Sequence, residues 1–297
     1  MVRLIARARR AMAALAALAL LCTAAAGAAP TLSVVDDRGL AVGFDRPVRR
    51  VVSLLPSLTE AVCALQACDR LVGVDRFSNW PAAVASLPRL GGLEDTPIER
   101  IVALRPDLVL AAGSARVIDR LEALGLKVLV LEARDLPDTR RVLEAVAQAL
   151  GRPGAGLALW ADIDRRITAA AGRVPPPLRG KRVYFEVGAE PYAAGESSFV
   201  GQVLARLGLA NVVPAGWGPF PKLNPEFVVR SAPDLVMASQ RSLAEMPARP
   251  GWSALAALRE GRSCGFAPAR FDLLVRPGPR LGEGAELIAD CLARLAR

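Results

Sequence analysis

Carboxylates and aromatic rings are the side chains through which this sequence could do chemistry, since its 297 residues include no histidine. The absence of histidine excludes His-assisted serine or cysteine hydrolases, His-ligated zinc or manganese sites and His-ligated haem. An enzyme would depend on carboxylates, and the candidates are Glu60, Glu186, Glu190 and Asp272. No spacing pairs any two of these as acid and base, so an exported enzyme is the weakest functional hypothesis. We expect no resident metal or cofactor.

Aromatic residues on loops indicate a different chemistry, the contact of a small ligand in a cleft. Aromatic residues make up only 5% of the chain, yet Phe77 and Trp80 lie on the polar loop 75–81. Trp217 and Phe220 lie on a second loop that is rich in glycine and proline. Packing within the fold is the commoner role for any single aromatic residue. Because such loops occur in both halves of the chain, lining a cleft is an equally good interpretation.

A sequence repeat shows how the elements that carry these residues are organised. The stretch 99–111 (ERIVALRPDLVLA) recurs at 226–238 (EFVVRSAPDLVMA), an offset of 226 − 99 = 127 residues. Each copy predicts a short helix that begins with an acid, a turn at Pro-Asp and a buried strand. A unit built twice predicts two similar lobes, and small ligands usually bind in the cleft between such lobes.

Each half also begins with a strand followed by a turn that contains serine. Strand 51–55 leads through Pro56 into Ser57-Leu-Thr-Glu60, which predicts a capping box at the start of a helix. Strand 183–187 is followed by Ser198, which precedes an apolar helix. Capping is the structural role of these serines, but the free N–H groups of such a turn can also face a ligand.

Two consecutive helices connect the halves. An amphipathic helix over 138–150 is followed by the turn 151–154 (Gly-Arg-Pro-Gly) and by a second helix over 155–171, which ends before three consecutive prolines. We therefore divide the chain into an N-terminal lobe (29–153), a linking helix (154–179) and a C-terminal lobe (180–297). A single helical connection should act as a stiff strut, so large hinge closure is not expected.

The first 28 residues have the pattern of a secretory signal peptide. Four arginines precede the apolar run 12–21, and the small residues 26–28 form a cleavage site. Cys22 raises the alternative of a lipoprotein, which the large Leu21 before it disfavours. The mature chain should begin near Ala29 with a net charge of 9 − 4 = +5, spread along the sequence. Nucleic-acid binding is therefore not expected, and no later apolar run predicts a membrane helix.

Four cysteines remain after the signal peptide, an even number in an oxidising compartment. Three pairings are possible. We favour a disulfide between Cys264 and Cys291, on the expectation that a C-terminal strand packs against the last helix. Cys63 and Cys68 lie on or near one helix, where they could be buried thiols.

Three motifs make the sequence resemble a known family: the turn 57–60, the segment 98–107 (IERIVALRPD) and the motif RPGPR at 276–280. They are similar to motifs of periplasmic substrate-binding proteins of the helical-backbone type, which deliver cobalamin, haem or ferric siderophores to ABC importers. The resemblance covers nearly all of the chain from Val51 onward and is strongest to cobalamin-binding members. It implies an α/β fold of two similar lobes, each a central, mostly parallel sheet flanked by helices, joined by a single long backbone helix. We expect a periplasmic protein that is monomeric when free.

The resemblance implies that an acid on the tip of each lobe docks into arginine-lined pockets of an ABC importer permease dimer. These acids fall on Glu99 and Glu226. A carboxylate in the first helical turn is also favoured by the helix dipole, by about 0.3–1 kcal/mol. Dipole stabilisation does not demand equivalent tips on two lobes, whereas docking to a symmetric permease does.

The predicted ligand-binding residues are spread over both lobes: Pro56, Ser57, Phe77, Trp80, Tyr192, Ser198, Trp217, Phe220, Asp272 and Arg276. In the family pattern Phe77 replaces a tyrosine that stacks on the corrin, and Phe220 replaces a tryptophan. Asp272 and Arg276 fall where the family has residues that hydrogen-bond the corrin side chains. An aromatic residue that the pattern places near Leu93 is missing, which reduces the stacking area available to a large flat ligand.

A haem or ferric-siderophore receptor is the alternative within the same class of protein. It would need Tyr192 as an iron ligand, or arginines such as Arg76 and Arg276 around anionic groups.

Overall fold

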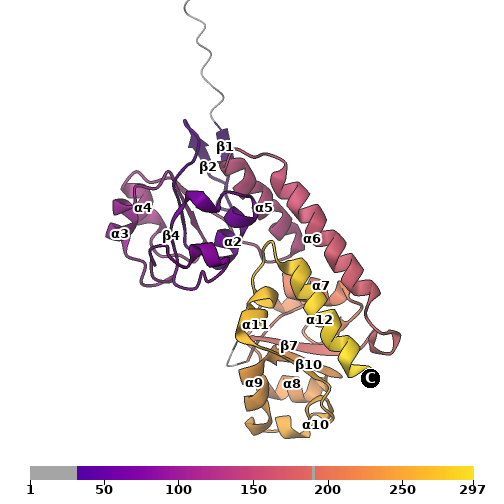
Figure 1. Ribbon diagram of the computed structural model, residues 1–297. Coiled ribbons are helices and arrows are strands. Elements are labelled where there is room, and N and C mark those ends of the chain that lie inside the picture. Colours follow the sequence, from indigo (N-terminus) through magenta and orange to yellow (C-terminus); the bar gives the residue numbers. More distant parts are fainter. Residues whose placement is uncertain (1–31, 189–190) are drawn as a thin grey trace, which may run out of the picture.

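Two α/β lobes lie at the two ends of a long helix in the computed structural model of the protein (Figure 1). The structure describes residues 32–188 and 191–297. The signal peptide predicted over 1–28, with Cys22, lies outside the described residues, and so does Glu190. The predicted fold, two lobes built on mostly parallel sheets flanked by helices, is confirmed.

The N-terminal lobe is built on a parallel sheet in the strand order β4-β3-β5-β6. Along β5, Leu108 and Leu110 join one core cluster while Val109 and Ala111 join another, because successive side chains point to opposite faces. Helices α2 and α5 cover the first face, and α3 and α4 cover the second. The elements are β3 (Val51–Ser53), α2 (Pro56–Ala64), β4 (Leu71–Val74), α3 (Ile98–Ala103), β5 (Leu108–Ala111), α4 (Ile118–Ala123), β6 (Val128–Val130) and α5 (Leu136–Ala149).

A hairpin of β1 (Leu32–Val35) and β2 (Ala41–Phe44) precedes this sheet. It is tied to the edge strand β6, since the backbone N–H of Asp37 donates to the carbonyl oxygen of Val130 at 3.0 Å. The hairpin therefore covers a sheet edge that would otherwise be open to pairing with another chain.

The C-terminal lobe repeats the plan with a sheet in the order β11-β10-β7, to which β9 adds in parallel and β8 antiparallel. Its strands are β7 (Arg182–Gly188), β8 (Tyr192–Ala193), β9 (Ala210–Asn211), β10 (Leu235–Ser239) and β11 (Ser263–Phe266). Its helices are α7 (Phe199–Arg206), α8 (Pro225–Ser231), α9 (Gln240–Glu245), α10 (Ala256–Arg259), α11 (Pro268–Val275) and α12 (Leu281–Leu295).

The predicted repeat appears as α3 and β5 in one lobe and as α8 and β10 in the other. The residue before the proline of each Pro-Asp turn has a positive φ angle, 45° at Arg105 and 42° at Ala232. These two residues are also 232 − 105 = 127 positions apart. The following aspartate holds the start of the neighbouring strand in both copies. Asp107 accepts from the backbone N–H of Arg50, and Asp234 from that of Arg182. The Pro-Asp turn is therefore a structural device used twice.

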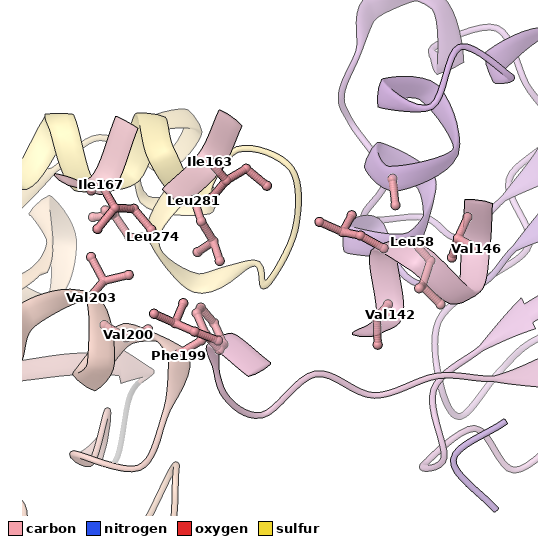
Figure 2. Packing of buried hydrophobic residues seen from close by; sticks show 14 of the residues in the cluster. Leu58, Val142, Val146, Ile163, Ile167, Phe199, Val200, Val203, Leu274 and Leu281 are labelled. Atoms are coloured by element: carbon pink, nitrogen blue, oxygen red, sulfur yellow. The ribbon is translucent and has the colours of Figure 1, made fainter. Parts of the chain in front are cut away.

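Helix α6 (Ala155–Gly172) connects the lobes and occupies most of the predicted linking segment. Its side chains Ile163 and Ile167 belong to a core cluster that includes Leu58 and Val146 of the N-terminal lobe and Leu281 of the C-terminal lobe (Figure 2). A bidentate ion pair between Arg166 and Glu286 fastens α6 to α12. These contacts support the prediction of a stiff strut. Within the described residues, no helix is long and apolar enough to cross a membrane.

Replacing Gly156 by alanine should destabilise the protein, because α5 and α6 approach each other closely at this residue. A Cβ atom there would lie 2.4 Å from the Cα atom of Glu144 and from the carbonyl oxygen of Leu143. Overpacking of this kind costs about 1–3 kcal/mol, which urea unfolding would measure. Gly172→Ala is the control, since it lies at the other end of α6 with nothing within 4 Å. It should be neutral or stabilising, and equal stability of both variants would contradict the close approach.

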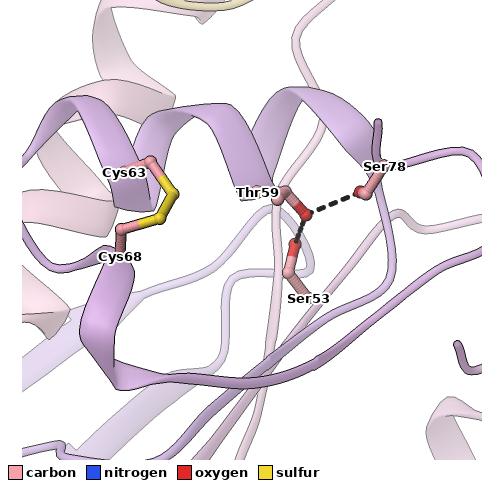
Figure 3. Close-up of a disulfide and its surroundings, with 5 residues drawn as sticks. All are labelled: Ser53, Thr59, Cys63, Cys68 and Ser78. Carbon is pink, nitrogen blue, oxygen red and sulfur yellow. Dashed lines mark hydrogen bonds between the residues drawn. A yellow bond between two sulfur atoms is a disulfide. The ribbon is translucent and has the colours of Figure 1, made fainter. Parts of the chain in front are cut away.

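Both pairs of cysteines form disulfides. Cys264 of β11 is joined to Cys291 of α12 with their Cα atoms 6.1 Å apart, as favoured from the sequence. The expectation that Cys63 and Cys68 are thiols is wrong, because they form a second disulfide (Figure 3). Helix α2 ends at Ala64, and the chain turns back so that the two Cα atoms are 4.1 Å apart. A continued helix would have kept these side chains from meeting.

Candidate functional site

The first turn of the N-terminal lobe differs from the predicted capping box. Pro56 is itself the first residue of α2, the N-cap is Leu55, and no side chain caps the helix. Ser57 therefore lies inside the helix, and Glu60 is only 2% exposed. Proline at this position has no N–H to satisfy and has the φ angle that a helix needs. The side chains that the capping box would have used are free to make tertiary contacts.

Loop 75–81 is held by a buried chain of hydroxyl groups at the end of β3 (Figure 3). The hydroxyl oxygen of Thr59 is 2.8 Å from those of Ser53 and Ser78. Asp75 accepts from the hydroxyl of Ser78 and, at 2.8 Å, from the backbone N–H of Phe77. Burial raises the pKa of the Asp75 carboxyl, and these two hydrogen bonds oppose that rise. The loop that carries Phe77 is thus fixed from within the lobe.

Arg276 joins the two lobes through a network of hydrogen bonds. One guanidinium nitrogen donates to Glu60 and to the side-chain oxygen of Asn79, both at 2.8 Å. The other donates to Asp272 at 2.8 Å and to the carbonyl oxygen of Phe77 at 3.3 Å. The amide nitrogen of Asn79 in turn donates to Asp272 at 3.0 Å. A single arginine of the C-terminal lobe therefore contacts α2 and loop 75–81 of the N-terminal lobe.

Glu60 is the buried centre of this network. Burial raises the pKa of its carboxyl, and the hydrogen bond from Arg276 opposes that rise. A guanidinium nitrogen of Arg280 lies 3.8 Å from the same carboxylate oxygen. Two positive groups thus favour the ionised form that burial disfavours.

The segment after α11 lies against the N-terminal lobe at two further points. The guanidinium of Arg280 stacks over the ring of Trp80 at 4.4 Å from its centroid. A Cβ atom at Gly278 would be 3.5 Å from the carbonyl oxygen of Ser57. The structure therefore brings together four predicted residues from two distant parts of the sequence: Phe77, Trp80, Asp272 and Arg276. Ser57 lies beside them.

Sequence reasoning did not include Glu60, Asn79 or Arg280 in the predicted ligand-binding set. The sequence indicates two other roles for Glu60, as part of a capping box and as a candidate carboxylate of an enzyme. Arg280 is the last residue of the RPGPR motif, so this motif was a signal in the sequence that could have placed Arg280 in the site. Nothing in the sequence around Asn79 indicates that it bonds to residue 276.

The predicted residues of the C-terminal lobe divide between two faces. Phe220 packs edge-on against Phe199 at 5.6 Å between ring centroids, on the side of the core cluster shared with α6. Trp217 packs instead against Phe227, whose ring centroid is 4.5 Å away and which contacts the separate core cluster of the outer face. Trp217 therefore lies beside α8, the helix that carries Glu226.

Tyr192 and Ser198 have different exposure. The ring of Tyr192 is 41% exposed, with the ammonium group of Lys222 at 5.9 Å from its centroid. Ser198 is fully buried; its hydroxyl donates to the carbonyl oxygen of Gly195 at 2.7 Å and accepts from the backbone N–H of Gly201 at 2.9 Å. The hydroxyl of Ser198 thus caps α7, and we omit it from the ligand contacts proposed below.

Glu99 and Glu226 are exposed in the first turns of α3 and α8. The carboxylate of Glu226 is 3.5 Å from the guanidinium of Arg230, an exposed pair on the same helix. The backbone N–H of Glu226 donates to the side chain of Asn224, which caps α8. Both acids occupy equivalent positions in the two lobes, as the repeat predicts.

Three carboxylates considered for an enzyme, those of Glu60, Glu186 and Asp272, are paired with arginines rather than with each other. Glu60 and Asp272 share Arg276. Glu186 is buried and forms a bidentate pair with Arg249, where it also accepts from the hydroxyl of Tyr184 at 2.9 Å. Within the described residues, no group of three or more cysteine, aspartate and glutamate side chains could hold a metal ion.

Comparison with known proteins agrees with this architecture. The model of a family described as "Periplasmic binding protein" matches residues 51–264. The uncharacterized ABC transporter substrate-binding lipoprotein YvrC of Bacillus subtilis is 27% identical over 263 residues, 84% of this chain and 82% of that protein. The vitamin B12-binding protein of Vibrio vulnificus is 26% identical over 255 residues, 84% of this chain and 92% of that protein. The structure of the periplasmic heme-binding protein RhuT from Roseiflexus superposes with a TM-score of 0.72 at 26% identity, covering 84% of this chain and all of that one.

Proposed function

Because the chain belongs to the periplasmic binding protein family and is similar over 84% of its length to a substrate-binding protein of an ABC transporter, we propose that it delivers cobalamin or a related corrinoid to an ABC importer. The ligand lies between the lobes in this proposal, in contact with Phe77, Trp80 and Phe220. The turn at Pro56 and Ser57 faces it from the N-terminal lobe. Curated relatives named as vitamin B12-binding and cobalamin-binding proteins support this choice.

The observation that carries the proposal is the balance of charge between the lobes. Arg276 and Arg280 are opposed by Glu60 and Asp272, all within one network. Arg76, which could have received an anionic ligand, is paired with Asp95 instead. A corrinoid carries amide side chains, which a neutral network of donors and acceptors can bind without an excess of charge.

The rings at the rim of this network support the binding of a large flat molecule. The side chain of Phe77 is 58% exposed and that of Trp80 is 37% exposed, although both are large and apolar. Aromatic faces of this kind provide stacking area at little cost in conformational entropy. Exposed rings next to a polar network are typical of ligand pockets.

A haem or ferric siderophore is the second candidate, and Tyr192 is the observation that favours it. Its phenol is exposed and lies beside the cation of Lys222. Tyrosine is an established ligand of haem iron. Against this candidate, the two arginines that would bind anionic groups, Arg76 and Arg276, already have carboxylate partners.

Titration with cyanocobalamin should quench tryptophan fluorescence, and Trp80 should account for most of the change. Trp80→Phe should remove most of the quenching, whereas the control Trp160→Phe, on α6, should retain it. Energy transfer to the corrin falls steeply with distance, so the tryptophan nearest the ligand dominates. A flat titration with cyanocobalamin and a strong response to haemin would reject the corrinoid in favour of the second candidate.

Export and docking complete the proposal. Residues 1–28 would direct the chain out of the cytoplasm, which agrees with the periplasmic location of the family. Glu99 and Glu226 would dock to the permease, and the stiffness of α6 would hold these two acids at a fixed separation.

A further inference from the structure

We propose that Glu60 is a specificity-determining residue: its buried carboxylate cancels the charge of Arg276 and so makes the cleft select against anionic ligands. This inference rests on the proposed function only in placing the ligand between the lobes. Glu60 itself is 2% exposed and lies beneath the network, so it acts on the ligand through Arg276 and Arg280.

The position of Glu60 explains why it, rather than Asp272, decides the charge. Glu60 contacts both guanidinium groups, at 2.8 Å from Arg276 and at 3.8 Å from Arg280. Of the two guanidinium groups, Asp272 contacts only that of Arg276, and its side chain is 27% exposed, so solvent screens its charge more strongly. Removing the charge of Glu60 would leave the largely buried guanidinium groups of Arg276 and Arg280 with only the partly exposed carboxylates of Asp272 and Glu283 as partners.

The other charged groups around the network do not disturb this balance. Asp75 lies within the electrostatic reach of Arg276 and of Arg89, which also donates to the backbone of loop 75–81. Glu283 lies 3.7 Å from Arg280, and its side chain is 38% exposed, so solvent screens it more strongly than Glu60. With Glu60 ionised, the guanidinium groups of Arg276 and Arg280 each have carboxylates within 4 Å, so a ligand that brings its own negative charge finds neither cation without a carboxylate partner.

The conservative variant Glu60→Gln tests the inference, because glutamine keeps the acceptor oxygen for Arg276 and removes the charge. The probes are haemin, with two carboxylates, and haemin dimethyl ester, in which both are capped. We expect the wild type to bind the ester at least as tightly as haemin. Glu60→Gln should raise the affinity for haemin relative to the ester by about tenfold, the effect of one charge at about 10 Å in a partly buried site.

Glu186→Gln is the matched control. Glu186 is a buried glutamate paired with an arginine, as Glu60 is, but its partners Tyr184 and Arg249 lie in or against the outer core cluster of the C-terminal lobe. It should change stability without changing the ratio of the two affinities. A role of Glu60 in folding alone would likewise leave that ratio unchanged.

The outcomes separate this inference from the proposed function. A tenfold shift in the haemin to ester ratio supports the inference, whatever the affinity for cyanocobalamin. An unchanged ratio in Glu60→Gln, or no haemin binding by either protein, overturns it. If Glu60→Gln does not fold, tighter binding of haemin than of its ester by the wild type overturns the inference, and the reverse order supports it. The failure of the wild type to bind cyanocobalamin would overturn the proposed function alone.

Discussion

Replacing Glu99 and Glu226 together by alanine should abolish uptake while leaving the affinity for the ligand nearly unchanged. Both side chains are exposed at equivalent points of the two lobes and lie outside the network around Arg276. A charge-assisted hydrogen bond contributes about 1.5–3 kcal/mol, so losing two would weaken docking by about 3–6 kcal/mol. That is about a hundredfold or more in the dissociation constant for the importer. Uptake by cells that carry the importer and ligand titration of the purified protein would measure the two effects.

The control for this variant is a pair of exposed acids on short helices elsewhere. Asp119 lies in the first turn of α4, and Glu245 is the last residue of α9. Their double replacement by alanine changes the net charge equally and should leave uptake intact. Loss of ligand affinity in the Glu99 and Glu226 variant would show instead that these acids belong to the pocket.

Arg276→Ala should be among the most destabilising single changes in the protein. It removes the hydrogen-bonded partner of Glu60, which would remain buried with only the guanidinium of Arg280, at 3.8 Å, to compensate its charge. Breaking a buried pair in this way costs about 3–5 kcal/mol. We expect a loss of about 3 kcal/mol in the free energy of unfolding at neutral pH, because Arg280 keeps part of the compensation. Urea unfolding would measure it.

The loss should depend on pH in a defined direction. Burial already raises the pKa of Glu60, and without Arg276 the pKa in the folded state should rise further above that in the unfolded chain. A group with a raised pKa in the folded state favours folding at low pH and loses this contribution as the pH rises through that pKa. The variant should therefore recover stability relative to the wild type as the pH falls below neutral.

Arg230→Ala provides the comparison for this effect. Arg230 forms an exposed pair with Glu226, and exposed pairs contribute at most about 1 kcal/mol. Its replacement should change the free energy of unfolding little at any pH. A similarly small, pH-independent effect of Arg276→Ala would contradict the buried network described above.

Local patterns accounted for much of the fold. The apolar runs after the two Pro-Asp turns predicted β5 and β10, because strands buried on both faces need uninterrupted apolar residues. The offset of 127 residues predicted that the lobes match, and the matched positive φ angles at Arg105 and Ala232 agree with it. The capping box failed because Pro56 supplied a stronger helix start than Ser57.

The candidate site was predicted only in part. The family resemblance brought Phe77, Asp272 and Arg276 into one set, but it gave no reason to add Glu60. The disulfide between Cys63 and Cys68 was missed because it depends on where α2 ends and on the turn that follows. Trp217 was grouped with the pocket on its sequence position, whereas its packing on Phe227 places it beside α8.

The features that could be read from the order of residues are those that repeat along the chain: the two similar lobes, the helix that joins them and the two matched acids. These features follow from periodicity and short motifs, which act over neighbouring residues. Which charges meet is known from the folded chain alone, since Glu60 and Arg276 are 216 residues apart and no local pattern relates them. The reason is that burial and Coulomb interaction depend on distance in space, and the fold alone sets that distance.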